Sequence, residues 1–121
     1  MIPARRLATA AGLWVLLVAP APGAVGSCDA EDVAADPYDF CYEINGLKIQ
    51  RDDAAGRITE AEARARLAML DTTCRAFAWP ADCVPPPTRL EQRACADALS
   101  DVSRLHEPSD AIAECQDLCG E

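Results

Sequence analysis

Seven cysteines in 121 residues restrict the possible folds of this chain more than any other feature of its sequence. They are Cys28, Cys41, Cys74, Cys83, Cys95, Cys115 and Cys119. In an oxidising compartment cysteines at this density form disulfide bonds, and a domain of about 90 residues with few aromatic side chains depends on such bonds for its stability. No Cys-x-x-Cys is present, so a thioredoxin-like redox site lacks its motif. The cysteines therefore predict a small disulfide-rich domain of an exported protein.

The first 27 residues have the pattern of a secretory signal peptide. Arg5 and Arg6 precede an apolar run over 7–19, and a stretch of small residues and prolines follows over 20–27. At about 13 residues the apolar run is too short for a transmembrane helix, which needs about 20. We expect the mature chain to begin at Cys28 and to be exported, to the periplasm or cell envelope of a bacterium or otherwise by secretion.

Cys28 stands at the expected cleavage site, in the sequence Val25-Gly26-Ser27-Cys28. This sequence resembles the bacterial lipobox, and the resemblance implies that Cys28 carries a lipid as the N-terminus of a lipoprotein, which would be the only contact with a membrane. Two other fates stay open: a free thiol or a disulfide to another chain, and an internal disulfide that leaves a different cysteine unpaired. In every case except the last, six cysteines remain for three internal bonds.

The chain is acidic, with a net charge of −9. Loss of Arg5 and Arg6 with the signal peptide takes the net charge of the mature chain to about −11. A surface of this sign repels phosphate backbones, so we expect no nucleic-acid binding. It attracts cationic proteins, although acidic charge also serves solubility alone.

Helical periodicity and capping signals follow an acidic, extended lead-in over 28–36. We predict helices over 37–53, 60–78, 88–106 and 110–119. Thr59 and Thr88 each begin a Thr-x-x-Glu capping box, and a Pro-rich loop separates the second helix from the third. The apolar face of the third helix is expected to contain Leu90, Ala94, Ala98, Val102 and Leu105. The sequence thus predicts an all-α domain over 37–121, built from two helical hairpins stapled by disulfides.

The hairpins also suggest which cysteines pair. Cys41 and Cys74 are equally distant from the turn near Gly56, so we expect them to close the open end of the first hairpin. In the second hairpin, two arrangements stay open. They are Cys95 with Cys119 and Cys83 with Cys115, or the nested set Cys83 with Cys119 and Cys95 with Cys115.

Motifs for enzymatic chemistry are missing from the sequence. It has neither a Gly-x-Ser-x-Gly nor a His-Glu-x-x-His motif, and the only histidine, His106, lies at a predicted helix end where it would serve as a cap. Cys115 and Cys119, one helical turn apart, would bind a soft metal only if both were reduced. We therefore expect no enzyme, no cofactor and no metal site.

The turn after the first helix resembles an EF-hand calcium loop in outline only. The matching residues are Asp53, Gly56, Ile58 and Glu62. Arg51 takes the first place, where the ion needs a carboxylate, and Ala55 takes the fifth. The hairpin turn accounts for the same residues without calcium.

Charge and compartment together favour a binding module. The leading hypothesis is an exported accessory or inhibitor-type protein that meets a cationic protein partner, by analogy with envelope-localised lysozyme or toxin inhibitors. The alternatives are a structural envelope lipoprotein anchored through Cys28 and, with less support, a cysteine-based metal carrier.

Overall fold

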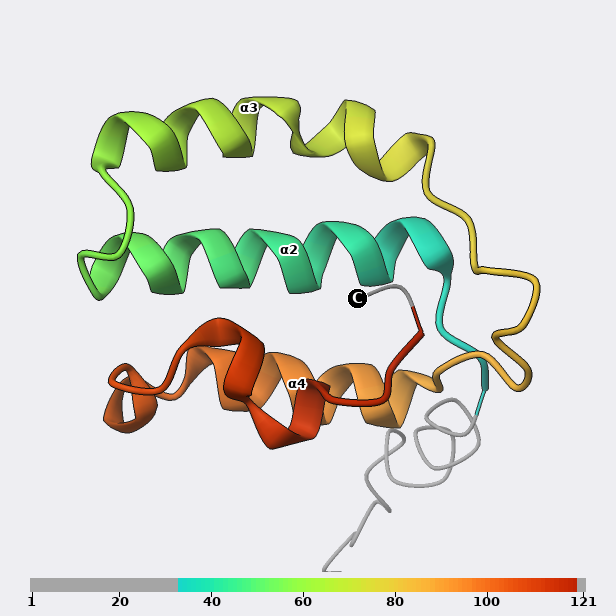
Figure 1. The fold of residues 1–121 in the computed structure, drawn as a ribbon. Helices are drawn as coiled ribbons and strands as arrows, with labels where there is room; N and C mark the ends of the chain where they lie inside the picture. The colour runs from blue at the N-terminus through green and yellow to red at the C-terminus, as the bar shows by residue number, and fades with distance from the viewer. Residues whose placement is uncertain (1–32, 120–121) are drawn as a thin grey trace, which may run out of the picture.

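The computed structural model describes residues 33–119, which fold into three α-helices followed by short 3-10 turns (Figure 1). The helices are α2 over Pro37–Ala54, α3 over Glu60–Arg75 and α4 over Arg89–Ser100. The 3-10 turns are Val102–Arg104, Ser109–Ala111 and Ala113–Cys115. These elements confirm the predicted class, a small all-α domain stapled by disulfides. The predicted signal peptide and Cys28 lie outside the described residues.

Local signals in the sequence explain where each helix begins. The Asp36 side chain accepts a hydrogen bond from the Asp39 amide at 3.0 Å, and Pro37 occupies the first turn, where no amide is needed. Thr88 and Glu91 form a complete capping box, with each side chain bonded to the other residue's amide at 3.2 Å. Before α2, Ala34 forms an isolated antiparallel bridge with Thr88, so the lead-in is fixed beside the start of α4.

Helices α2 and α3 form the antiparallel hairpin predicted around Gly56, whose φ of 72° suits the left-handed region of the turn. Cys41, Leu70 and Cys74 are buried between the two helices. Gly46 lies against Leu70, because a Cβ atom built there would be 3.4 Å from the leucine Cδ2. A Cβ at this distance would make an ordinary van der Waals contact, so the two helices pack closely at Gly46 but alanine would also fit there.

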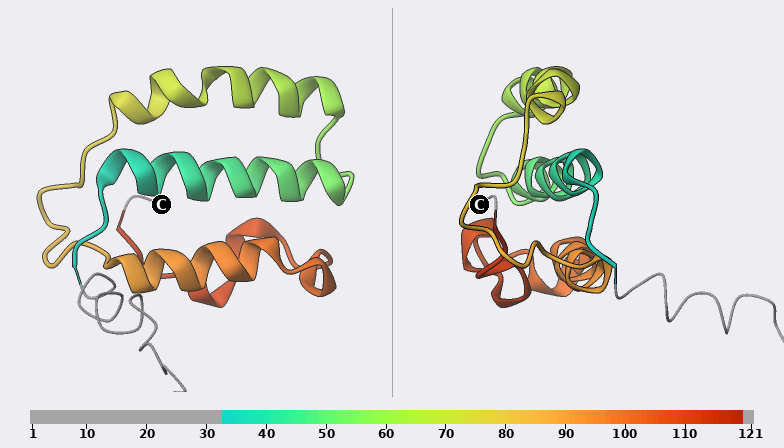
Figure 2. Two further views of the ribbon diagram at one scale, coloured as in Figure 1. Left: turned by 180° about the vertical axis from the view of Figure 1, so that it is seen from behind. Right: turned by 90° about the vertical axis from the view of Figure 1, so that its right-hand side faces the viewer.

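Helix α2 is the centre of the molecule, with α3 on one side and α4 on the other (Figure 1). The 3-10 turns after α4 fold back beside α4 and below α2, as the end-on view in Figure 2 shows. The main core lies between α2, α4 and these turns. Its buried members are Ala35, Phe40, Ile44, Cys95, Ala96, Ala98, Leu99, Ile112, Cys115 and Leu118.

The third predicted helix is too long, and its predicted apolar face is wrong at Leu90 and Val102. Helix α4 ends at Ser100 because the Asp101 carboxylate accepts the Ser103 amide at 2.9 Å and begins a 3-10 turn instead. Leu90, expected in the core, is 50% exposed and Val102 is 78% exposed. Ala98 is buried as predicted, and the rest of the buried face of α4 consists of Cys95, Ala96 and Leu99. His106 consequently lies in the turns after α4 and not at a helix end.

The α-helix predicted over 110–119 is also wrong. Two 3-10 turns take its place, separated by Ile112, which has an extended backbone with ψ of 113°. Gln116 is extended as well, and Asp117 has a φ of 59°. Ile112, Cys115 and Leu118 are nevertheless buried, as the apolar pattern implies. The second hairpin is therefore one α-helix covered by irregular chain.

The helix predicted over 60–78 ends three residues earlier than predicted, at Arg75.

Candidate binding surface

An open groove of about 810 Å³ runs between α2 and α4. Its lining is Asp36, Tyr38, Asp39, Tyr42, Glu43 and Leu47 from α2 and its cap, and Arg89, Gln92, Arg93, Ala96, Asp97 and Ser100 from α4. We call this surface the α2–α4 groove. Partly buried Leu47 packs against the core, and Ala96 belongs to it, so both form the apolar floor. The C-terminal turns cover a different face of the same two helices, the one that contains Cys95 (Figure 2).

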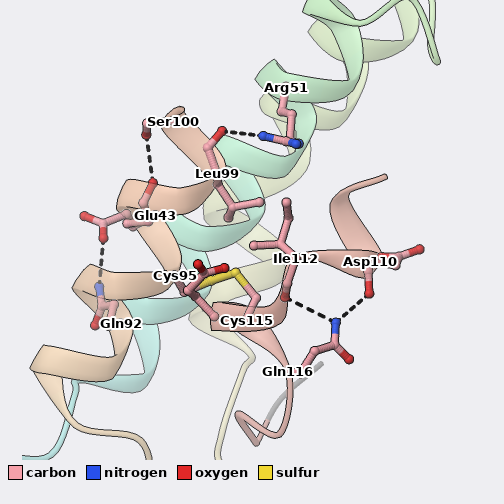
Figure 3. Close-up of a disulfide and its surroundings, with 12 residues drawn as sticks. Glu43, Arg51, Gln92, Cys95, Leu99, Ser100, Asp110, Ile112, Cys115 and Gln116 are labelled. Atoms are coloured by element: carbon pink, nitrogen blue, oxygen red, sulfur yellow. Dashed lines mark hydrogen bonds between the residues drawn. A yellow bond between two sulfur atoms is a disulfide. The ribbon is translucent and has the colours of Figure 1, made fainter. Parts of the chain in front are cut away.

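The two walls of the groove differ in charge. The α2 wall contains the carboxylates of Asp36, Asp39 and Glu43, and α4 contributes Asp97 together with Arg89 and Arg93. Glu43 accepts a hydrogen bond from the Gln92 amide nitrogen at 3.4 Å, a weak contact that joins the walls near the middle of the groove (Figure 3). Within the groove, the acidic charge therefore lies mainly on the α2 side.

Two tyrosines lie at the edge of the α2 wall. The rings of Tyr38 and Tyr42 stack with their centroids 5.7 Å apart. The Tyr38 hydroxyl donates a hydrogen bond to Asp71 on α3 at 2.7 Å, which raises the pKa of Tyr38 above its ordinary value. This bond and the Arg75 guanidinium lower the pKa of Asp71. Tyr38 is thereby held in place, while Tyr42, 46% exposed, presents its ring to solvent.

Arg51 on α2 fixes the far end of α4 and the turns behind it. Its side chain is 3% exposed, and its guanidinium donates to the carbonyl oxygen of Leu99 at 3.1 Å (Figure 3). It also donates to the carbonyl oxygens of Glu107, at 3.0 Å, and of Arg104. The Leu99 carbonyl belongs to the last turn of α4, where no intrahelical amide remains to bond it. The guanidinium therefore caps the C-terminus of α4 and suits its negative dipole end.

A second arginine extends this attachment. Arg57 donates to the Leu105 and Glu107 carbonyls at 2.6 and 3.0 Å. Beside it the Asp52 carboxylate accepts the Ser109 hydroxyl at 2.7 Å. These bonds tie the turns to the end of α2. The role of Arg51 was not predicted from the sequence, where its only signal was a cation near the end of the first predicted helix.

The turns have an ion-pair network of their own around Arg104. Its guanidinium contacts Glu107 at 2.7 Å and Glu114 at 2.8 Å. These contacts lower the pKa of both glutamates and raise the pKa of Arg104. These ion pairs stabilise the conformation of the turns after α4, which lack α-helical hydrogen bonds.

Three disulfides connect the six cysteines within the described residues. Cys41 pairs with Cys74, the pair that the first hairpin suggests. Cys83 pairs with Cys119, and Cys95 with Cys115 (Figure 3), so the second arrangement is the nested one. The extended backbone after Cys115 explains this choice, because it carries Cys119 away from α4 toward the Pro-rich loop.

The described residues contain no group of three or more histidine, cysteine, aspartate or glutamate side chains placed to hold a metal ion. Cys115 and Cys119 are both disulfide-bonded, so neither is a thiolate ligand. In the turn with the calcium-loop outline, Arg51 points into the core instead of toward the loop.

No helix between residues 33 and 119 has the length and apolar character needed to cross a membrane. Comparisons of the chain with protein-family models, with curated proteins and with solved structures find no match.

Proposed function

We propose that this chain is an exported, disulfide-stabilised binding module, of the accessory or inhibitor type, that associates with a cationic protein partner. The observation that carries the proposal is the α2–α4 groove, an open surface with four carboxylates and an exposed tyrosine on a strongly acidic chain. Opposite charges on partner and groove would speed association and select against acidic partners.

The exposed Tyr42 ring supports the same proposal. Tyrosine is enriched at protein interfaces, where it buries a large rigid area at low cost in conformational entropy. A partner lysine or arginine over this ring, close to Glu43, would gain a cation–π contact together with an ion pair. Such contacts favour a basic protein as partner.

Three disulfides indicate an extracellular or otherwise oxidising compartment. Within that class we propose the periplasm or cell envelope of a bacterium, on the strength of the signal-peptide pattern and the lipobox-like sequence before Cys28.

Capture from an envelope extract of the producing cells tests the proposal. With the oxidised mature domain immobilised at about 50 mM NaCl, the retained proteins should have high isoelectric points and should elute by about 300 mM, since salt screens exposed charges. The proposal is contradicted if the retained proteins are as acidic as the whole extract, or if they resist elution by salt.

A structural lipoprotein anchored through Cys28 is the second candidate. One observation favours it: the other six cysteines pair among themselves, which leaves Cys28 as the odd cysteine. A pure tether should carry a lipid on Cys28 and retain no salt-sensitive protein. The cysteine-based metal carrier has the least support, because six of its ligands would be consumed in disulfides.

A further inference from the structure

The α2–α4 groove has the shape and charge pattern to receive a helix. Its lining residues span about three turns of each neighbouring helix, from Asp36 to Leu47 on α2 and from Arg89 to Ser100 on α4. The two helices run in the same direction, because Gln92 near the start of α4 contacts Glu43 and Leu99 near its end contacts Arg51. A furrow between two neighbouring helices is where a third helix packs in a bundle.

The spacing of the wall charges matches a helical ligand. Asp39 and Glu43 are four residues apart on α2, and Arg89 and Arg93 are four residues apart on α4. Each pair is therefore separated by about 6 Å along the groove, at about 1.5 Å rise per residue. Side chains at positions i and i+4 of a helix laid along the groove have the same separation.

From this pattern we infer that the groove binds an amphipathic α-helix of a partner protein, which places two basic residues, four apart, against Asp39 and Glu43. This inference rests on the proposed function and specifies the partner's contact element. The apolar face of that helix covers Leu47 and Ala96, and Tyr42 flanks one basic side chain. The opposite flank is neutral or acidic, because the α4 wall contains two arginines, Arg89 and Arg93, and only one carboxylate, that of Asp97. An evenly basic helix is therefore a poorer ligand than one with basic residues on a single flank.

The test uses an 18-residue synthetic helical peptide with lysines at i, i+4 along one flank and leucines on the adjacent face. A second peptide of identical composition has its lysines distributed around the helix. Titration into the isotopically labelled mature domain is followed by amide chemical shifts. We expect shifts that cluster over 38–47 and 89–100, and tighter binding of the first peptide than of the second.

Two matched variants distinguish the effect of the groove on peptide binding from the effect of the overall net charge. Asp39→Asn with Glu43→Gln alters the α2 wall, whereas Glu60→Gln with Glu62→Gln removes the same charge from the exposed start of α3. The groove variant should weaken peptide binding about three- to tenfold, and the α3 variant less than about twofold, as expected for exposed ion pairs. Because Asp39 and Glu43 are exposed, neither change should unfold α2.

Several outcomes overturn the inference. Equal weakening by the two variants, equal affinity for the two peptides, or shifts that cluster on α3 would show that charge alone attracts the ligand. A dimer found by light scattering, together with amide shifts over 38–47 and 89–100 that depend on the concentration of the free domain, would assign the groove to a second copy of the chain. The proposed function fails separately, if envelope capture retains no basic protein while the peptide still binds in the groove.

Discussion

Replacing Arg51 with methionine is expected to destabilise the domain by about 2–4 kcal/mol. Methionine keeps most of the apolar stem but removes all three hydrogen bonds to the carbonyls of Leu99, Arg104 and Glu107. A bond from a charged donor is worth about 1.5–3 kcal/mol, and a buried carbonyl left without a partner costs about 1–3 kcal/mol. Of the three bonds only the one to Leu99 is fully buried; those to Arg104 and Glu107 are partly exposed, so water replaces much of what they contribute, and Arg57 still donates to the Glu107 carbonyl. The net loss is therefore close to that of the Leu99 bond and its unpaired carbonyl. The Nε atom of Arg51 is buried and has no hydrogen-bond partner among residues 33–119, so its removal offsets part of that loss.

Urea unfolding of the oxidised protein, followed by far-ultraviolet circular dichroism, measures this change. Arg64→Met is the matched control, because Arg64 pairs with Glu60 at 2.9 Å while both side chains are largely exposed. That control should change the free energy of unfolding by less than about 0.5 kcal/mol. Arg51→Lys should fall between the two, since an ammonium cannot reproduce the planar donor geometry. Equal stabilities of the Arg51→Met and Arg64→Met variants would refute the capping role.

Three further predictions concern stability and acid response. Replacing Cys95 and Cys115 together with alanine opens a loop closed across 20 residues and should cost about 3 kcal/mol in urea unfolding. Thr88→Ala removes one half of the capping box and should cost about 1 kcal/mol, with faster amide exchange in the first turn of α4. The folded state lowers the pKa of Asp71, so its contribution to stability is present above the ordinary aspartate pKa and is lost as the pH falls through the lowered value. Carboxyl titration by NMR should find that Tyr38→Phe raises this pKa, because the hydroxyl donor is gone; an unchanged value would contradict the assigned cause.

The first hairpin was predictable because its signals are local. The helix starts are fixed by hydrogen bonds within a few residues, which the side chains of Asp36 and Thr59 accept, and by Pro37 in the first turn of α2. Gly56 marks the turn between the helices. Once two antiparallel helices are known, geometry alone suggests the Cys41–Cys74 bond. The all-α class followed from the same reasoning.

The region after α4 was not predictable in this way, because contacts distant in sequence decide it. Val102 and Leu105 continue a helical apolar pattern, yet Asp101 bonds the Ser103 amide and Arg51 captures the Leu99 carbonyl. Those bonds replace the helical ones that a longer α4 would make. The periodicity in the sequence contained no information about a guanidinium located 48 residues earlier.

For the candidate site, the sequence predicted only the sign of the charge and not the position of the groove. Composition indicated a cationic partner, but the position of the groove depends on which face of α4 the C-terminal turns cover. The disulfide between Cys95 and Cys115 fixes that face. Sequence spacing left this pairing open, so the groove lined by Asp39, Glu43 and Arg89 required the structure.

Intact mass of the protein purified from the cells that produce it tests most directly the central claim, that this is an exported domain stapled by three disulfides. We expect a chain of residues 28–121 that is lighter by two hydrogens per disulfide, in which no cysteine beyond Cys28 is alkylated without reduction. Any lipid on Cys28 appears in the same spectrum as added mass. A chain that retains residues 1–27 and is alkylated at all seven cysteines without reduction would be neither exported nor stapled by disulfides.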